Sequence, residues 1–246
     1  MATDPHTHTT YSDGEFPEAM ASAAEEHGLD GIGFADHLLP GLDERRQHYG
    51  MNMDIPEVRE RRSEAIEKMR DEYSIQIWDA AEIDYLPGIE LEETLRNTDF
   101  DYVLGSVHYL DGDHVLAERH FSGLDKGQRE QKVDQYFDSL VDMVESELFD
   151  VAAHPDAIEN NQYLEPLVTE EHYDRLFQAF RRSDTLPEIN AAKALEPETS
   201  FYRRWRDEDL EFSFGTDAHS PSELEERNRL REGLESEPVP VEEFTG

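Results

Sequence analysis

Short apolar segments alternate with amphipathic helical segments along most of this 246-residue chain, and this alternation restricts the possible folds more than any other feature. Buried strands are expected at 31–35, 75–81, 101–106, 149–153, 186–189 and 210–215. Helices are expected at 17–27, 56–72, 126–148, 170–183 and 221–234. Strands that alternate with helices form parallel sheets, and a chain of this length fits one β/α barrel. The pattern therefore predicts an α/β barrel that forms a single domain over residues 1–246.

A histidine or an acidic residue stands just past the end of most of these expected strands. These residues are His37, Glu82, His108, His154, Asp217 and His219. Near the amino terminus, His6 and His8 are two positions apart, so both side chains face the same way if the segment is extended. The carboxyl ends of the strands form the active site in β/α barrels. We therefore expect these side chains to meet in one pocket.

The residue types in this set are those of a metal centre. The chain has no cysteine, so any metal must be bound by histidine, aspartate or glutamate. Imidazole together with carboxylate favours zinc, manganese or iron, whereas a site made only of oxygen ligands favours magnesium or calcium. Two metals about 3.5–4 Å apart can hold the attacking and leaving oxygens of an in-line displacement, and a carboxylate such as Glu82 could bridge them. The set therefore predicts a metal-dependent phosphoester hydrolase.

Composition restricts the partners of this chain. It has 22 lysine and arginine residues against 59 aspartate and glutamate residues, and the net charge of −37 opposes binding to DNA, RNA or an anionic membrane. Only four of the basic residues are lysines, and the acidic residues are spread along the whole length. Salt at about 1 M shortens the Debye length to about 3 Å and screens such repulsion, so we expect a halophilic protein that requires salt. No secretory signal or membrane-spanning segment is evident, and the expected location is the cytoplasm.

Seven short motifs occur in order along nearly the whole chain, and together they resemble the polymerase-and-histidinol-phosphatase (PHP) family. They are HTHTTYSDG (6–14), ADH (35–37), AAEIDYLPG (80–88), GSVHYLDG (105–112), AHPD (153–156), EIN (188–190) and GTDAH (215–219). The segments DYLPG and GSVHYLDG are most similar to the histidinol-phosphate phosphatase branch, which serves histidine biosynthesis. The resemblance implies a distorted (β/α)7 barrel of the TIM type with a trinuclear metal site, and a phosphomonoesterase of the EC 3.1.3 class.

The resemblance also implies a role for each site residue. One metal ion would be held by His6, His8, Glu82 and Asp217. A second would be held by Glu82, His108 and His154. A third, held by Asp13, His37 and His219, would bind the phosphate while a hydroxide between the first two ions attacks phosphorus. The three ions are expected to be zinc, manganese or iron, and the residues expected to be catalytic are Glu82, Asp217 and His219.

Two features depart from the family pattern. Only five residues precede His6, so the first strand is expected to be short or poorly ordered. The phosphatase branch tends to carry arginine after the EIN-like strand and a basic residue beyond the AHPD motif, where this chain has 191–195 (AAKAL) and 159–161 (ENN). We expect Lys193 and Asn190 to contact the substrate, with Lys193 acting as a point charge without the fork geometry of arginine. The expected substrate is a small phosphorylated molecule.

Several other polar residues have two interpretations. Four acidic residues could attract the cationic amine of histidinol phosphate or could be ordinary surface acids: Asp84, Asp111, Asp113 and Asp156. Five histidines are expected to lie outside the metal centre: His27, His48, His114, His120 and His172. Of these five, His114 and His120 remain candidates for contact with the substrate.

Three alternatives to this function stay open. An amidohydrolase barrel also begins with His-x-His, but it needs a bridging lysine, and none of the four lysines is suitably placed. A PHP-type phosphodiesterase or exonuclease would act on nucleotides or short oligonucleotides, although the charge of −37 opposes a nucleic-acid groove. A non-catalytic metal-binding PHP module would be expected to have lost ligands, whereas all nine positions keep metal-compatible side chains. The sequence leaves the leaving-group acid and the oligomeric state undetermined.

Overall fold

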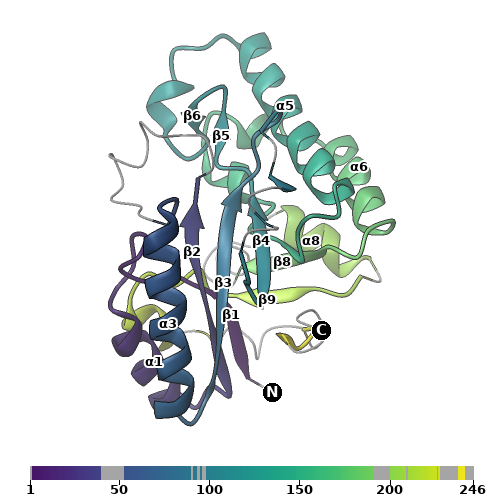
Figure 1. Cartoon of the computed structure of the whole chain (residues 1–246). Coiled ribbons are helices and arrows are strands. Elements are labelled where there is room, and N and C mark those ends of the chain that lie inside the picture. Colours follow the sequence, from purple (N-terminus) through teal and green to yellow (C-terminus); the bar gives the residue numbers. More distant parts are fainter. Residues whose placement is uncertain are drawn as a thin grey trace.

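A seven-stranded parallel sheet forms the centre of the computed structural model (Figure 1). The structure describes residues 2–39, 53–89, 91, 92, 95, 98–190, 200–208, 210–225, 227 and 238–241. The strands lie in the order β1–β2–β3–β4–β7–β8–β9, and every neighbouring pair is parallel. Their bounds are β1 Thr3–Thr7, β2 Gly31–Leu38, β3 Gln76–Asp84, β4 Tyr102–Ser106, β7 Val151–Ala152, β8 Leu186–Asn190 and β9 Ser213–Gly215.

Backbone hydrogen bonds curl the sheet into a nearly closed barrel. The Asp217 N–H donates to the His6 carbonyl at 2.8 Å, and the His8 N–H donates to the Ala218 carbonyl at 2.8 Å. Thr7 and Ala218 form a parallel bridge at the same place. The segment that follows β9 therefore pairs with β1, and the predicted α/β barrel is confirmed. The division into one domain stays a prediction.

Helices cover the outside of the barrel on two sides (Figure 1). On one side lie α1 Pro17–Glu26 and α3 Pro56–Glu72. On the other lie α5 Lys126–Glu145, α6 Glu170–Phe180 and α8 Ser200–Arg206. The short 3-10 helices are η1 Glu118–His120, η2 Ala157–Asn160, η3 Glu165–Leu167 and η4 Pro221–Leu224, and a small hairpin joins β5 Tyr109–Leu110 to β6 Asp113–His114. Within the described residues, no helix is long and apolar enough to cross a membrane.

Local sequence signals set the ends of these helices. Pro17 and Pro56 stand at the first positions of α1 and α3, where the N–H that proline lacks would have no helical partner. Asp125 caps α5, because its side chain accepts from the Gln128 N–H at 2.9 Å and the Gln128 side chain accepts from the Asp125 N–H at 3.0 Å. Gly28 ends α1 with a φ of 72°, a conformation that glycine adopts without strain.

Side chains inside the barrel change from apolar to polar along the strands. Alternate residues of a strand point to the same face. The inner layer near the amino ends consists of Ala35, Trp78, Ala80, Tyr102, Leu104, Val151 and Ala153. Gly33 belongs to this layer, since a Cβ there would lie 1.7 Å from the Tyr102 hydroxyl oxygen. The same inward faces continue with His37 on β2 and Glu82 on β3, which are direct partners in the strand register.

Several strand bounds differ from the expected ones. β2 and β3 extend to Leu38 and Asp84, so His37 and Glu82 lie inside the strands and not beyond them. The parallel ladder continues through these polar residues, which a search for apolar runs misses. The strands expected at 149–153 and 210–215 shrink to β7 and β9, and β1 is short, as expected, with all its residues buried. The closing helix begins as the 3-10 turn η4, and most of the range 225–234 lies outside the described residues.

Candidate active site

The nine expected ligands lie at the carboxyl ends of the strands and converge there. Four overlapping groups each bring one ligand atom per member within 4.8 Å of one another. The groups are His6, Glu82 and His154; His6, His8 and Asp217; His37, Glu82 and His108; and His8, Asp13, His37 and His219. Because the groups share members, the nine side chains form one continuous cluster, and the expected convergence is present.

Glu82 is fully buried at the centre of this cluster. Its Oε1 lies 2.8 Å from His154 Nε2 and 3.5 Å from His108 Nε2. Its Oε2 lies 2.8 Å from His37 Nδ1 and 3.6 Å from His6 Nε2. One carboxylate thus faces histidines from β1 and β2 and from the ends of β4 and β7, which is the arrangement that a bridging ligand needs.

His6 lies in β1 and His8 directly follows this strand, and their side chains point to the same side. Their Nε2 atoms are 3.2 Å apart. His8 Nε2 also lies 2.9 Å from Asp217 Oδ1. Since Asp217 belongs to the segment that closes the barrel against β1, the closure of the fold is also what brings this carboxylate to the two histidines.

Asp13 and His219 form a rim around the inner part of the cluster. Asp13 Oδ1 lies 3.3 Å from His219 Nε2, 3.7 Å from His37 Nε2 and 3.9 Å from His8 Nδ1. The side chains of Asp13 and His219 are each 35% exposed, whereas those of His6 and Glu82 are fully buried. The cluster therefore has a closed inner part and a rim that faces solvent.

Glu188 is a functional candidate that the sequence analysis missed. Its Oε1 lies 2.8 Å from His6 Nδ1, and its Oε2 accepts from the His154 N–H at 2.8 Å. A carboxylate on the outer nitrogen of a metal-binding histidine fixes the orientation of the ring. A Cβ on Gly215 would lie 2.3 Å from Glu188 Oε1, so only glycine leaves room there. The EIN motif carried the signal, because Glu188 shares the inward face of β8 with Asn190.

Two further histidines are held through one ring nitrogen and present the other to the cluster. His108 Nδ1 lies 3.2 Å from both Asp84 Oδ1 and Ser106 Oγ, and its Nε2 faces Glu82. The His219 Nδ1–H donates to the carbonyl of Asp217 at 2.8 Å, while Nε2 faces the rim. Support of this kind from outside is typical of histidines that bind metals.

Two residues of the cluster adopt left-handed backbone conformations that are uncommon without glycine. The φ angle is 29° for His154 and 57° for Asp217. Such conformations cost on the order of 1–3 kcal/mol and persist where the surroundings enforce them. The His154 N–H is held by Glu188 and the Asp217 N–H by the His6 carbonyl, so the strain sits where the cluster is assembled.

The density of charge shifts the pKa values of the cluster in opposite directions. Burial and the charge of His37 lower the pKa of His8 to about 4. Burial also opposes a charge on His37, but Glu82 and Asp13 outweigh it and raise the pKa of His37 to about 9. Burial would raise the pKa of Glu82, yet His37 and His108 hold it well below its usual range. Divalent ions that bind to the cluster would therefore displace protons from some histidines.

The donor atoms of the cluster fit divalent metal ions. Glu82 Oε2 is buried, and although His37 Nδ1 is close, this oxygen receives no well-aligned hydrogen bond. The Nε2 atoms of His6 and His8 point toward each other and toward the same carboxylates. Converging lone pairs are satisfied by cations, and imidazole with carboxylate is a donor set of zinc, manganese and iron.

Of the two residues expected to contact substrate, Asn190 lies within the described residues. Lys193 lies outside the described residues. Asn190 is fully buried at the end of β8, and neither atom of its side-chain amide has a hydrogen-bond partner among the described residues. A buried amide without partners costs free energy and is rare in native proteins. Two residues beyond Glu188 on the same inward face, it points toward the cluster.

Two of the acidic residues that could attract a cationic substrate have other contacts, and a third is buried. Asp111 accepts from Lys132 Nζ at 2.6 Å, and Asp113 Oδ1 lies 2.8 Å from His120 Nδ1. Asp156 is buried. These contacts favour the interpretation of Asp111 and Asp113 as structural acids. His120 is occupied by its contact with Asp113.

The remaining histidines lie mostly away from the cluster. His27 forms the carboxyl-terminal cap of α1. His172 takes part in the capping box at the amino end of α6, and its ring stacks on that of Phe137 with the centroids 4.7 Å apart. His48 lies outside the described residues. His114 is the exception, because its ring lies parallel to that of His108 with the centroids 5.5 Å apart. It therefore remains a candidate for contact with the substrate.

A family model for the PHP domain matches residues 4–192. The chain belongs to the PHP domain family. The matched range contains every residue of the cluster except Asp217 and His219. The resemblance that the seven motifs carry is thereby confirmed at the level of the family.

Relatives of this PHP chain include two histidinol phosphatases. A probable histidinol-phosphatase of Deinococcus radiodurans is 28% identical over 249 residues, covering 90% of this chain and 87% of that protein. The crystal structure of histidinol phosphate phosphatase from Lactococcus lactis, complexed with zinc, L-histidinol and phosphate, has a TM-score of 0.72 at 20% identity, covering 97% of this chain and 95% of that one. These relatives confirm the expected enzyme class, a phosphoric ester hydrolase.

The same fold also occurs in a different setting. A chain in the cryo-EM structure of archaeal ribonuclease P with mature tRNA has a TM-score of 0.52 at 12% identity, covering 98% of this chain and 86% of that one. This likeness concerns the fold alone, and a fold does not define a function. The function of the PHP chain must therefore be argued from its cluster.

Proposed function

We propose that this chain is a metal-dependent phosphomonoesterase of the histidinol-phosphatase type. The observation that carries the proposal is the convergence of nine histidine and carboxylate side chains around the buried Glu82. Structural metal sites are closed, whereas catalytic sites keep an open position. Because the rim at Asp13 and His219 faces solvent, the cluster favours catalysis over a structural role.

The cluster is proposed to hold three divalent ions, drawn from zinc, manganese and iron. The first position uses His6, His8, Glu82 and Asp217, and the second uses Glu82, His108 and His154. The third uses Asp13, His37 and His219. This division is supported by the central place of Glu82 and by the separate rim group in which Asp13 meets three histidine nitrogens.

Divalent ions at these positions would supply a hydroxide nucleophile at neutral pH and neutralise phosphate charge. The chain itself holds the geometry, since Glu188 fixes the His6 ring and Asp84 supports His108. Burial of the inner part keeps bulk water out, which strengthens electrostatic interactions there. Of the residues expected to be catalytic, Glu82 joins the two inner positions, while Asp217 and His219 connect the inner part with the rim.

Asn190 is proposed as a contact for the substrate. Its side-chain amide offers a donor and an acceptor, and both lack partners among the described residues. A phosphate oxygen or a substrate hydroxyl could satisfy them and remove the cost of burial. Lys193 is proposed as a second contact on the basis of sequence alone.

The proposed substrate is L-histidinol phosphate. Support comes from the names of the two relatives, which match this chain over 90% and 97% of its length. A net charge of −37 disfavours long nucleic acids, whose own negative charge would be repelled. The cluster suits a small phosphomonoester that enters at the rim.

A phosphate-release assay tests the proposal. The purified protein in molar salt, supplied with manganese or zinc, is expected to release phosphate from L-histidinol phosphate faster than from other phosphomonoesters and from the diester bis(p-nitrophenyl) phosphate. Chelation is expected to abolish the activity, and added metal is expected to restore it. Faster turnover of the diester would support the phosphodiesterase alternative, and the absence of metal-dependent turnover across the panel would reject the enzyme.

A further inference from the structure

A network of buried ion pairs lies on the outer face of the barrel, behind β2, the strand that carries His37. Arg62 of α3 is only 1% exposed; its Nε donates to Asp36 Oδ2 at 2.7 Å, and its Nη1 donates to Asp79. Its Nη2 donates to the carbonyls of Phe34 and Ala80. Asp36 and Asp79 are outward residues of β2 and β3, so this network faces α3 and not the histidine and carboxylate cluster inside the barrel.

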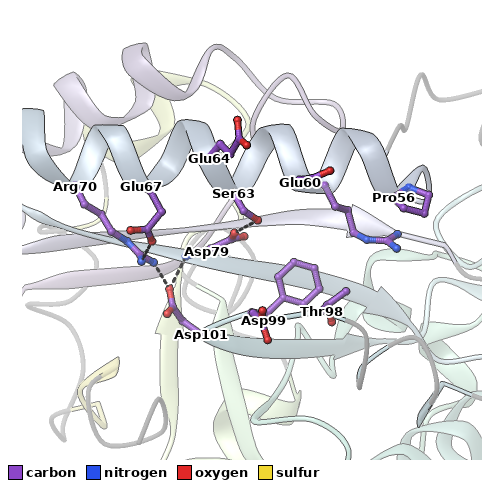
Figure 2. A pocket seen from close by; sticks show the side chains of 12 residues that line it. Pro56, Glu60, Ser63, Glu64, Glu67, Arg70, Asp79, Thr98, Asp99 and Asp101 are labelled. Atoms are coloured by element: carbon purple, nitrogen blue, oxygen red, sulfur yellow. Dashed lines mark hydrogen bonds and ion pairs between the residues drawn. The ribbon is translucent and has the colours of Figure 1, made fainter.

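One side of the network holds the helix on the barrel (Figure 2). There Ser63 Oγ donates to Asp79, and Arg70 pairs with Asp101 beside a cavity of about 550 Å³. This cavity is lined by α3, by Asp79 of β3 and by residues 98–101, which directly precede β4, and none of the nine cluster residues lines it. Contacts on this side therefore hold α3 in place and do not reach the histidine and carboxylate cluster.

The other side of the network reaches the loop that follows β1. Asp36 Oδ1 accepts from the Thr9 N–H and from Ser12 Oγ, both at 2.7 Å, and Oδ2 accepts from Thr9 Oγ1 at 2.8 Å. Ser12 Oγ also lies 3.5 Å from His8 Nδ1. A single buried carboxylate thus receives three hydrogen bonds from a short loop that runs from His8 to Asp13.

The place of Asp13 depends on this loop. The Gly14 N–H donates to the Thr9 carbonyl at 2.9 Å, and a Cβ on Gly14 would lie 2.2 Å from the His8 carbonyl oxygen, so the turn is tight. The Asp13 side chain is 35% exposed, and its ion pairs are with ring nitrogens of the rim. Its position is therefore set by the loop backbone, and Asp36 holds that backbone.

We propose that Asp36 is a positioning residue for the rim metal position, and that it acts on Asp13 through Thr9 and Ser12. The inference rests on the proposed function only in that the rim binds a divalent ion. β2 presents His37 to the pocket on one face and Asp36 to the loop on the other, so one strand places a rim ligand and anchors the loop that brings another. Loss of the anchor weakens the rim position and leaves the inner positions intact.

A matched pair of serine variants tests this inference. Ser12→Ala removes a hydroxyl that donates to the network from the loop, and Ser63→Ala removes one that donates to it from the helix. Metal-free proteins are titrated with manganese by calorimetry in molar salt, and bound metal is counted by elemental analysis after dialysis. Ser12→Ala is expected to weaken one binding phase about 10–100-fold and to lose the corresponding metal. Ser63→Ala is expected to bind metal as the wild type does.

Three results would overturn the positioning role. They are wild-type metal binding by Ser12→Ala, equal weakening of all phases in that variant, and weakening of the same phase by Ser63→Ala. Asp36→Asn, if it folds, is expected to weaken the same phase more than Ser12→Ala does; if it does not fold, Ser12→Ala decides. A wild type that binds metal in distinct phases but hydrolyses no phosphoester would reject the proposed function alone.

Discussion

The inner part of the cluster and its rim are built in different ways. Inner residues such as His6 and Glu82 come from strands and are fully buried: Glu82 lies in the continuous parallel ladder of β2 and β3, and the His6 carbonyl accepts from the Asp217 N–H. Rim ligands such as Asp13 and His219 come from loops and are about one-third exposed. The comparison teaches that the fold itself preforms the proposed inner metal positions, whereas the loop that brings Asp13 to the proposed rim position depends on a few side-chain hydrogen bonds.

Glu82→Gln is expected to have the largest effect. The substitution keeps the shape of the side chain but removes the negative charge that faces five histidines. We expect metal to be lost from both inner positions and kcat/KM to fall by more than about 100-fold, the upper end for changes behind a ligand. Elemental analysis and phosphate release measure the two effects. Full metal content in this variant would show that Glu82 does not bridge.

Glu188→Gln tests the support behind the inner ligands. The amide can still contact His6, but it cannot hold the ring with a charge, and it competes for the His154 N–H. We expect the inner metal affinity to fall about 10–100-fold while the rim phase stays unchanged. Metal titration by calorimetry separates the phases, and an effect confined to the rim would contradict the division of the cluster into an inner region and a rim.

The sequence predicts the convergence of the cluster better than it predicts the residues that support the cluster. Cluster residues such as Glu82 and His154 are identifiable because each stands just past an apolar run of the sequence and because the carboxyl ends of parallel strands meet. Glu188 and Asp36 stand in the short motifs EIN and ADH, but the sequence does not show what they contact, since their partners come from distant segments. Arg62 lies in a helix with few apolar residues, where an arginine is expected to be exposed, yet it is buried against two aspartates. Buried ion networks of this kind leave no periodicity in the sequence.

Asp13→Asn is expected to act on the rim alone. The carboxylate is partly exposed, so its loss costs less than the loss of a buried ligand. We expect the rim phase to weaken about tenfold, the lower end of the range for changes around a metal, and activity to recover at millimolar manganese. The concentration of manganese at half-maximal activity is the measurement. Failure to recover in excess metal would show that Asp13 does more than bind the ion.

Two buried aspartates beneath these regions are expected to respond to pH with opposite signs. Burial raises the pKa of Asp4, which lies under the inner part, and Arg227 offsets this only in part. Burial also opposes the charge of Asp36 under the rim, but Arg62 outweighs it and lowers the pKa of Asp36. A lowered carboxyl pKa stabilises the fold above its unfolded value near 3.8, and this is lost as the pH falls. A raised pKa costs stability at neutral pH.

The two isosteric variants Asp36→Asn and Asp4→Asn turn this difference into a measurement. At pH 7 we expect Asp36→Asn to lower the free energy of unfolding, because the buried Arg62 loses a charged partner. We expect Asp4→Asn to lower it less or to raise it, because an unfavourable buried charge is removed. Urea unfolding at pH 7 and at pH 4 should show the effect of Asp4→Asn shrinking at the lower pH, whereas the effect of Asp36→Asn should largely persist, because pH 4 still lies above 3.8. Equal destabilisation by the two variants at pH 7 would contradict the assigned signs.

Of these changes, salt concentration is expected to cause the smallest difference in metal affinity between the inner positions and the rim position. Raising the salt from 0.1 to 1 M shortens the Debye length from about 10 to about 3 Å, which screens exposed charges more than buried ones. The rim phase should therefore weaken with salt while the inner phases change little. The same salt should raise the melting temperature, because it screens the self-repulsion of a chain with a net charge of −37, and this tests the expected halophilic character. Equal salt dependence of all metal-binding phases would mean that the rim is as well shielded as the inner positions.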